Sequence, residues 1–277
     1  MTPRPTARGA PDWIIYVAAV AAVAVLAVGQ QERSDAPAAP PPLKGRDGTG
    51  PTAGLRPAGI TALPQDQGRV SGTAFSVSDA GVWLTARHVV SGCRRTAVLV
   101  AEGRGVTAVV TADASSDVAV LTTEGGAPPL PLATELSLHQ GQRGFHPGFP
   151  RGQAGEAASR LLGPDTLQDG ARGSRPQSVL AWAEVGRTDG LRGSLAGLSG
   201  APVLDEAGRV VGVTLAESPR RGRIYSAPPQ AIRAALARAG RAAGGFAQGQ
   251  AITTDNYGRA ADGLRRELRV ARVMCLS

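Results

Sequence analysis

The stretch GLSGAPV, residues 197–203, places one hydroxyl between glycines and just ahead of a proline. These residue types are also common in turns, so the stretch alone is compatible with an ordinary turn between strands. In the other interpretation, the glycines let the backbone bend until Ser199 projects outward and nearby N–H groups point at a common spot. Such a serine becomes a nucleophile only beside a base, and the base needs an orienting acid.

The chain supplies one candidate base and one candidate acid upstream. His88 stands at the end of the apolar run VWLTARHVV, and Asp117 opens the apolar run in DASSDVAVL. Taken singly, each has a plain structural interpretation, a packed or exposed histidine and a turn aspartate. The order His88, Asp117, Ser199 on a β-rich pattern favours the chemical interpretation. His139 and His146 lie in Gly- and Pro-rich sequence and are expected at the surface.

The elements that must position these residues are mostly strands. From about residue 66, short apolar runs alternate with glycine-bearing turns. Frequent short strands with this punctuation predict an all-β sandwich or barrel of antiparallel strands. Helical periodicity comes late: residues 230–239 form one candidate helix. A second candidate presents Tyr257, Ala261, Leu264 and Leu268 on one face.

Three segments together resemble a known family. The segments are GTAFSVSDAGVWLTARHVV, DASSDVAVL followed by LPLA, and GLSGAPVLDEAGRVVGV. They are similar to the trypsin-like serine proteases, especially the bacterial HtrA/Deg branch. The resemblance covers roughly residues 66–238. It implies two six-stranded antiparallel β-barrels with the site in the cleft between them, with His88 and Asp117 on the first barrel and Ser199 on the second.

The resemblance also implies a mechanism. His88 takes the proton of Ser199 Oγ as that oxygen attacks a peptide carbonyl, and then returns the proton to the leaving amine. Asp117 fixes the imidazole tautomer, and the backbone N–H groups of Gly197 and Ser199 form the oxyanion hole. The implied activity is that of a serine endopeptidase working through an acyl-enzyme on protein or peptide substrates. No metal or organic cofactor is expected, because the sequence holds no HExxH motif and no clustered His and Cys ligands.

The loop that carries Ser199, here called the nucleophile loop, departs from the common family pattern at two positions. Leu198 stands where the family commonly has Asn, and Ala201 where it commonly has a second Gly. Neither change removes a catalytic atom. The alternative that stays open is a catalytically silent or latent protease-fold module that binds peptides or a partner protein in the cell envelope.

By position before the serine, the resemblance places Gly193 at the floor of the substrate pocket. It places Thr214, Leu215 and Ala216 on the pocket wall. No acid stands at the floor position, so a preference for Arg or Lys is not indicated. A small or medium apolar side chain is expected at the cleavage point.

The N-terminal sequence indicates export. Residues 13–29 are apolar and uncharged, and as a helix they span roughly 26 Å, enough to cross a bilayer core. Arg4 and Arg8 precede this run, so the positive-inside rule places residues 1–12 in the cytoplasm. We therefore expect a single-pass protein of the bacterial inner membrane with its later domain in the periplasm. The alternative is a signal peptide cleaved near residues 27–29, which would give a secreted protein.

Three further segments follow. Residues 30–65 are rich in Pro, Gly and Ala and predict an extended linker. Residues 66–238 are the predicted protease domain. Residues 239–277 are predicted to be a C-terminal extension, with an amphipathic helix, docked on the barrels. This extension is too short for the PDZ domain that often follows the protease domain in the HtrA/Deg branch.

The chain has two cysteines, Cys93 and Cys275. An even count in an exported chain predicts a disulfide between them, and the other possibility is two unpaired thiols. The net charge is +8, and Lys44 is the only lysine. The arginines are scattered and aromatic residues make up 4%, so no nucleic-acid partner is expected. The sequence does not indicate an oligomeric state.

Overall fold

The computed structural model describes residues 60–62, 71–167, 176–245 and 247–276. The predicted cytoplasmic segment 1–12, the predicted membrane segment 13–29 and most of the predicted linker 30–65 lie outside these residues. Within the described part of the chain, no helix has the length and apolar character needed to cross a membrane.

The first barrel consists of six antiparallel strands. They are β2 (Ser71–Ser78), β3 (Val82–Ala86), β4 (Arg95–Ala101), β5 (Arg104–Ala112), β6 (Val118–Thr123) and β13 (Val270–Leu276). Their hydrogen-bonded order is β5-β4-β13-β2-β3-β6, and β6 pairs back onto β5 to close the barrel. A further strand, β1 (Ile60–Ala62), pairs with β5. Closure satisfies the strand edges that an open sheet would expose.

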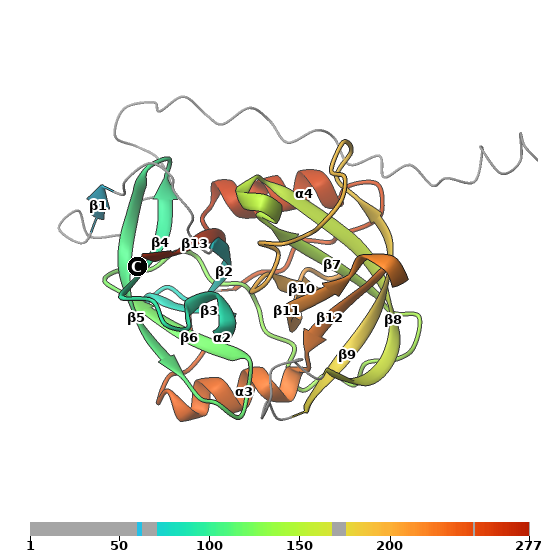
Figure 1. Cartoon of the computed structure of the whole chain (residues 1–277), viewed down its shortest axis with the longest axis horizontal. Helices are drawn as coiled ribbons and strands as arrows, with labels where there is room; N and C mark the ends of the chain where they lie inside the picture. The colour runs from blue at the N-terminus through green and yellow to red at the C-terminus, as the bar shows by residue number, and fades with distance from the viewer. Residues whose placement is uncertain (1–59, 63–70, 168–175, 246, 277) are drawn as a thin grey trace, which may run out of the picture. The chain divides into compact units, whose positions relative to one another are not determined.

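The second barrel is also a closed ring of six antiparallel strands. They are β7 (Arg143–Gly148), β8 (Gly155–Leu167), β9 (Gln177–Arg187), β10 (Pro202–Leu204), β11 (Val210–Ser218) and β12 (Arg223–Ala227). Their order is β10-β11-β12-β9-β8-β7, with β7 pairing back onto β10. Figure 1 shows the two barrels side by side, the first on the left and the second on the right. The predicted pair of six-stranded antiparallel barrels is confirmed.

Helices are short and few among the described residues. They are α2 (Arg87–Val90), α3 (Pro229–Arg238), α4 (Tyr257–Arg266) and the 3-10 turns η3 (Pro150–Gly152) and η4 (Pro219–Arg221). The two late helices fall where the periodicity predicts them. The predicted face of the second helix is buried, with Tyr257, Ala261 and Leu264 each at most 5% exposed.

The C-terminal segment differs from its prediction as an extension docked outside residues 66–238. Strand β13 lies between β2 and β4 and is one of the six strands of the first barrel. Five of its seven residues are buried, because the strand has neighbours on both edges and faces the barrel core. The predicted disulfide between Cys93 and Cys275 is confirmed, and it ties β13 to the turn that follows α2.

Each barrel core holds one fully buried tryptophan. Trp83 donates from its indole nitrogen to Thr123 Oγ1 (3.0 Å), and Trp182 donates to Ser226 Oγ (2.9 Å). Burying the indole N–H costs little free energy when a hydroxyl accepts its hydrogen bond, and the indole rings fill the interior of each barrel. These packed cores fix the strands from whose ends the loops of the site emerge.

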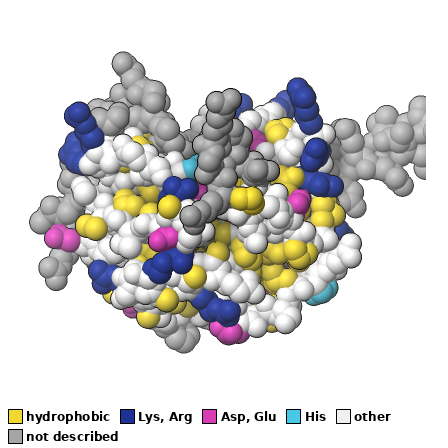
Figure 2. Space-filling model, turned by 60° about the horizontal axis from the view of Figure 1, so that its bottom comes forward, with side chains coloured by type: hydrophobic (Ala, Val, Ile, Leu, Met, Phe, Trp, Pro, Cys, Tyr) yellow, Lys and Arg dark blue, Asp and Glu magenta, His cyan; other side chains and the backbone are white. Residues whose placement is uncertain are grey.

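Charged side chains are distributed rather than gathered on the face seen in Figure 2. Dark blue Lys and Arg atoms lie there in several separate places, some of them beside magenta acidic atoms. On that face, the described basic side chains do not merge into one continuous patch.

Candidate active site

His88 and Asp117 form a close pair on the first barrel. Strands β3 and β6 pair with Ala86 opposite Val118, so the residues just beyond these two ends are neighbours. His88 Nδ1 lies 2.7 Å from Asp117 Oδ2, and the backbone N–H of His88 donates to Asp117 Oδ1 at 2.9 Å. A carboxylate only accepts, so Nδ1 carries the proton and Nε2 is left as the basic nitrogen.

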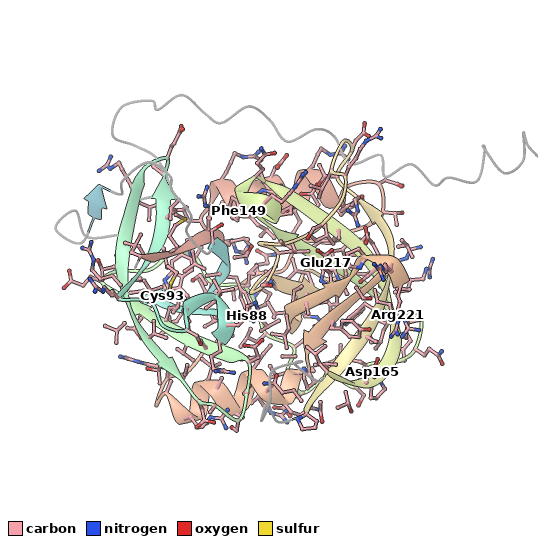
Figure 3. The ribbon with its side chains drawn as sticks, in the orientation of Figure 1. His88, Cys93, Phe149, Asp165, Glu217 and Arg221 are labelled. Carbon is pink, nitrogen blue, oxygen red and sulfur yellow. A yellow bond between two sulfur atoms is a disulfide. The ribbon has the colours of Figure 1, made fainter. Side chains whose placement is uncertain are left out.

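The pair is partly open to solvent on one side only. The His88 side chain is 45% exposed, whereas that of Asp117 is 13% exposed. The carbonyl of Asp117 also accepts from the N–H of Arg87 at 2.9 Å, which fixes the aspartate backbone. The imidazole can therefore reach a substrate while its orienting carboxylate is shielded. In Figure 3, His88 lies in the middle of the view, beside the second barrel.

The loop that carries Ser199 is pressed against the first barrel. Thr73 in β2 donates its N–H to the carbonyl of Ser199 (2.9 Å) and its hydroxyl to the carbonyl of Gly197 (2.8 Å). Gly72 leaves no room between the barrels, because a Cβ there would lie 2.6 Å from Val89 in α2 and 2.9 Å from the Ser199 carbonyl. The candidate nucleophile thus lies against the element that carries His88.

Two glycines are required by the shape of this loop. Gly197 has φ +96° and Gly200 has φ +88°, which L side chains rarely adopt. A Cβ at Gly197 would lie 2.6 Å from Phe149 O, and one at Gly200 would lie 2.0 Å from Thr73 O. Both space and backbone conformation therefore exclude a side chain at either position.

Two N–H groups of the loop point away from the protein's own acceptors. The Ala196 carbonyl accepts a hydrogen bond from the N–H of Arg151, and the Leu198 carbonyl accepts one from the N–H of Ala201. In a trans peptide the C=O and N–H point in opposite directions, so these bonds direct the N–H groups of Gly197 and Ser199 outward. Among the described residues neither N–H has a protein acceptor. Such a pair of donors can stabilise an oxyanion.

The hydroxyl of Ser199 donates to the carbonyl of Leu215 at 3.0 Å. No hydrogen bond between the described side chains joins Ser199 to His88. Leu215 lies where β11 shifts register against β12, which aims its carbonyl at the loop. To donate to the imidazole, the hydroxyl must first leave the Leu215 carbonyl. Catalytic hydrogen bonds often form only when substrate is bound.

A small depression, open to solvent, lies beside Ser199. Its lining residues come from the nucleophile loop, β11 and β12: Leu195, Ala196, Leu198, Ser199, Thr214, Ala216, Glu217 and Ile224. The predicted wall residues Thr214 and Ala216 are among them, whereas Leu215 and Gly193 are not. The carbonyl of Gly193 instead accepts from Arg187 Nη1 at 2.7 Å.

Sequence reasoning missed four lining residues, Leu195, Ala196, Glu217 and Ile224. Glu217 accepts hydrogen bonds from the Ser194 hydroxyl and, at 2.7 Å, from the N–H of Leu195. This carboxylate ties the nucleophile loop to the end of β11. The signal available in the sequence was the position of Glu217 just after Ala216, on the strand already assigned to the wall.

His146 is fully buried, so its expected place at the surface is wrong. Its Nδ1 lies 2.9 Å from Thr214 Oγ1 and its Nε2 lies 2.7 Å from Ser159 Oγ. Ser159 donates to the carbonyl of Gly144 (3.1 Å), so it accepts from Nε2–H, and Thr214 donates to Nδ1. Burial lowers the pKa of His146 to about 3. This neutral histidine supports the strand that lines the depression.

Comparisons with known proteins agree with this fold. The sequence profile of the family described as "Trypsin-like peptidase domain" matches residues 72–213. The active form of Rv3671c protease from M. tuberculosis superposes with a TM-score of 0.53 at 24% identity, covering 70% of this chain and 82% of that chain. The inactive form of Rv3671c protease gives a TM-score of 0.50 at 24% identity, covering 60% and 82%.

The HtrA-type protease AlgW, solved with a decapeptide, gives a TM-score of 0.47 at 21% identity and covers 61% of this chain and 51% of that chain. No curated protein sequence matches significantly. In the described residues after 246 the chain forms only α4 and β13, with no PDZ domain. The family match spans more than half of the chain and includes His88, Asp117 and Ser199, and the protein therefore belongs to the family of trypsin-like peptidase domains.

Proposed function

We propose that this protein is a serine endopeptidase that cleaves peptide bonds in protein substrates, with Ser199 as the nucleophile. The observation that carries the proposal is the His88–Asp117 pair at 2.7 Å on the first barrel. It lies beside a loop of the second barrel that presents Ser199 and two outward N–H groups. Nucleophile, base, orienting acid and oxyanion donors are the four parts that acyl transfer needs.

The reaction follows from these positions. Ser199 Oγ forms a bond to the substrate carbonyl carbon while His88 Nε2 accepts the hydroxyl proton. The π electron pair moves to the carbonyl oxygen, which accepts hydrogen bonds from the N–H groups of Gly197 and Ser199. Collapse of the tetrahedral intermediate breaks the C–N bond, and the amine leaves with the proton from His88. Water then repeats the sequence on the acyl-enzyme and releases Ser199.

Asp117 holds the imidazole of His88 in place throughout this sequence. It accepts from His88 Nδ1–H and from the His88 backbone, so the ring cannot turn when its charge changes. The imidazolium that forms during attack is stabilised by this carboxylate. One oxyanion donor is typically worth about 3 kcal/mol of transition-state stabilisation.

The depression beside Ser199 favours a small or medium apolar substrate side chain. Its walls include Leu195, Leu198 and Ile224, each at most 3% exposed. The Glu217 carboxylate at its edge accepts two hydrogen bonds on Oε1, which turn that oxygen toward the protein's own loop. Peptides with Ala or Val before the cleaved bond should therefore be cut faster than those with Arg or Lys.

The proposal includes a location. Residues 13–29 would anchor the chain in the bacterial inner membrane, with the peptidase domain in the periplasm. The supports are the uncharged apolar run, the arginines before it, and the disulfide, which persists in oxidising compartments. The alternative is secretion after cleavage. Extraction of membranes with alkali would release a cleaved, secreted chain but retain an anchored one.

The second candidate function is a latent module that binds peptides without cutting them. The observation that favours it is the hydrogen bond from the Ser199 hydroxyl to the carbonyl of Leu215, which occupies the proton that His88 would have to accept. In that case a partner or substrate would be needed to release the hydroxyl.

Cleavage of a mixed-sequence peptide library by the full-length chain tests the proposal. Cleavage should vanish in Ser199→Ala and fall at least 1,000-fold in His88→Ala, because the nucleophile loses its base. His139→Ala, in an exposed loop, is the matched control and should keep full activity. Cleavage that survives in Ser199→Ala would exclude the proposed nucleophile. A folded wild-type chain that cuts nothing would favour the latent module.

A further inference from the structure

The loop of residues 148–155, here called the backing loop, lies directly behind the oxyanion donors. Arg151 donates its N–H to the carbonyl of Ala196. The carbonyl of Phe149 lies where a Cβ on Gly197 would be only 2.6 Å away. Because the Ala196 carbonyl and the Gly197 N–H belong to one planar peptide, the backing loop sets the direction of that N–H.

The backing loop includes one residue in an unfavourable backbone conformation. Arg151 has φ +53° and ψ 30°, the left-handed region that non-glycine residues seldom occupy. Such a conformation persists only where the surroundings determine it. Local hydrogen bonds join Gly152 N–H to Phe149 O (2.9 Å) and Gln153 N–H to Pro150 O (3.1 Å), and further contacts come from the far end of the chain.

Arg265 in α4 holds both ends of the backing loop. Its Nη1 donates to the carbonyls of Gly148 (3.3 Å) and Gly155 (3.2 Å). Its Nη2 donates to Glu156 Oε2 (2.8 Å) and Asp262 Oδ1 (2.6 Å). The Arg265 side chain is 8% exposed, so the guanidinium is fixed between two carboxylates and two carbonyls. Planar bidentate geometry of this kind is specific to arginine.

Arg272 in β13 contributes a second contact. Its Nη1 donates to the carbonyl of Gly152 at 3.2 Å. Arg272 also lies opposite Thr73 in the pairing of β13 with β2, and Thr73 holds the carbonyls of Gly197 and Ser199. The C-terminal segment therefore reaches the nucleophile loop from two directions, through the backing loop and through β2.

From these contacts we propose that Arg265 and Arg272 are positioning residues for the oxyanion hole. They hold the backing loop in the shape that directs the Gly197 N–H at the substrate carbonyl oxygen. The proposal rests on the proposed peptidase function, since the oxyanion hole matters only for acyl transfer. Neither arginine touches the reacting atoms, so their effect must pass through the loop. A displacement near 1 Å of a catalytic group can cost on the order of 100-fold in rate.

The test uses full-length variants. Arg265→Lys keeps a positive charge beside Glu156 and Asp262 but cannot bridge four acceptors. Arg272→Met removes the donor to the backing loop. The control is Arg266→Met, an exposed neighbour at the end of α4 whose side chain makes no ion pair or hydrogen bond to another described residue.

The steady-state kinetics of peptide hydrolysis should show a lower kcat with little change in KM. We expect kcat to fall about 10-fold in Arg265→Lys and about 3-fold in Arg272→Met, with KM within twofold, because the oxyanion forms only in the transition state. Arg266→Met should match wild type in both. A merely structural role would lower the melting temperature without this split. Unchanged kcat in folded Arg265→Lys and Arg272→Met would overturn the proposal.

Hydrogen exchange gives a readout that does not need activity. The amides of residues 196–200 should exchange faster in Arg265→Lys and Arg272→Met than in wild type or Arg266→Met, while β9 and β12 stay unchanged. Equal exchange at residues 196–200 in all four chains would overturn the positioning role even if the wild-type chain cut no peptide. An inert wild type would by itself count against the proposed function only.

Discussion

The two barrels are built from the chain in different ways. The second barrel takes all six strands from one continuous stretch, residues 143–227. The first barrel takes five strands from residues 71–123 and its sixth, β13, from residues 270–276 at the end of the chain. Strand β13 is held there by two antiparallel ladders and a disulfide.

This difference decides which half of the site depends on distant sequence. The His88–Asp117 pair lies on the barrel that needs the chain end for closure. The nucleophile loop lies on the barrel whose strands are continuous in sequence, but it is oriented by Thr73 in the first barrel and by the backing loop. Loss of β13 should therefore open the first barrel and remove the Arg272 contact to the backing loop, while the second barrel core stays intact.

Removal of β13 should have the largest effect. A chain ending after Arg269 loses the strand between β2 and β4, leaving two unpaired edges and an open core. We expect peptide cleavage to fall to background. Hydrogen exchange should show loss of protection throughout residues 71–123 and retained protection in β9 and β12. Equal loss of protection in both barrels would contradict the claim that only the first barrel needs β13 for closure.

Replacement of both cysteines, Cys93→Ser with Cys275→Ser, should come next. The bridge closes a loop with a sequence separation of 182, for which the chain-entropy model gives up to about 5 kcal/mol. Denaturant unfolding of wild type and the double variant would measure the loss. Wild type in reducing buffer serves as control and should approach the variant. An unchanged free energy of unfolding would show that the β13 ladders alone close the first barrel.

Gly200→Ala tests the contact between the barrels. The new Cβ would lie 2.0 Å from Thr73 O and 2.4 Å from Thr85 Oγ1 at φ +88°. We expect a loss of about 3 kcal/mol in the free energy of unfolding, from backbone strain plus overpacking. Gly190→Ala is the matched control, because its φ is +75° with nothing within 4 Å. It should lose only about 1 kcal/mol, from strain alone. Equal losses in the two variants would mean that the nucleophile loop is not packed against the first barrel.

His146 makes the second barrel sensitive to acid, with a smaller effect. Burial lowers its pKa from 6.5 to about 3, so the neutral form contributes stability that is complete above pH 6.5 and is lost as the pH falls toward 3. By linkage the loss is about 2 kcal/mol at pH 5. The free energy of unfolding should fall by about 2 kcal/mol more between pH 8 and pH 5 in wild type than in His146→Gln. His139→Gln should behave as wild type. Parallel pH profiles for His146→Gln and wild type would exclude this role.

The candidate site was largely predictable because its three side chains sit in short local motifs. The order and context of His88, Asp117 and Ser199 survive in the sequence without knowledge of long-range contacts. Strand β13 was not predictable in this way. Its partners β2 and β4 lie more than 160 residues earlier in the chain, and the local sequence VARVMCL does not identify them.

His146 and Arg265 show the same limit at single residues. The Gly and Pro around His146 suggested a loop, yet this segment is strand β7, and its imidazole points into the barrel, where two hydroxyls satisfy it. Arg265 is one of three arginines in α4, and nothing local distinguishes it from the other two. Its side chain differs from theirs because it donates to carbonyls more than 100 residues away. Burial and long-range pairing, rather than residue type, decided both cases.

The central claim is that the His88–Asp117 pair of the first barrel activates Ser199 of the second. The most direct measurement is labelling of the full-length chain with a fluorophosphonate probe, with the modified residue mapped by mass spectrometry. The account predicts a single adduct on Ser199 that is absent in Ser199→Ala and at least 100-fold slower to form in His88→Ala. An adduct on another residue, or labelling of Ser199 at the same rate without His88, would contradict it.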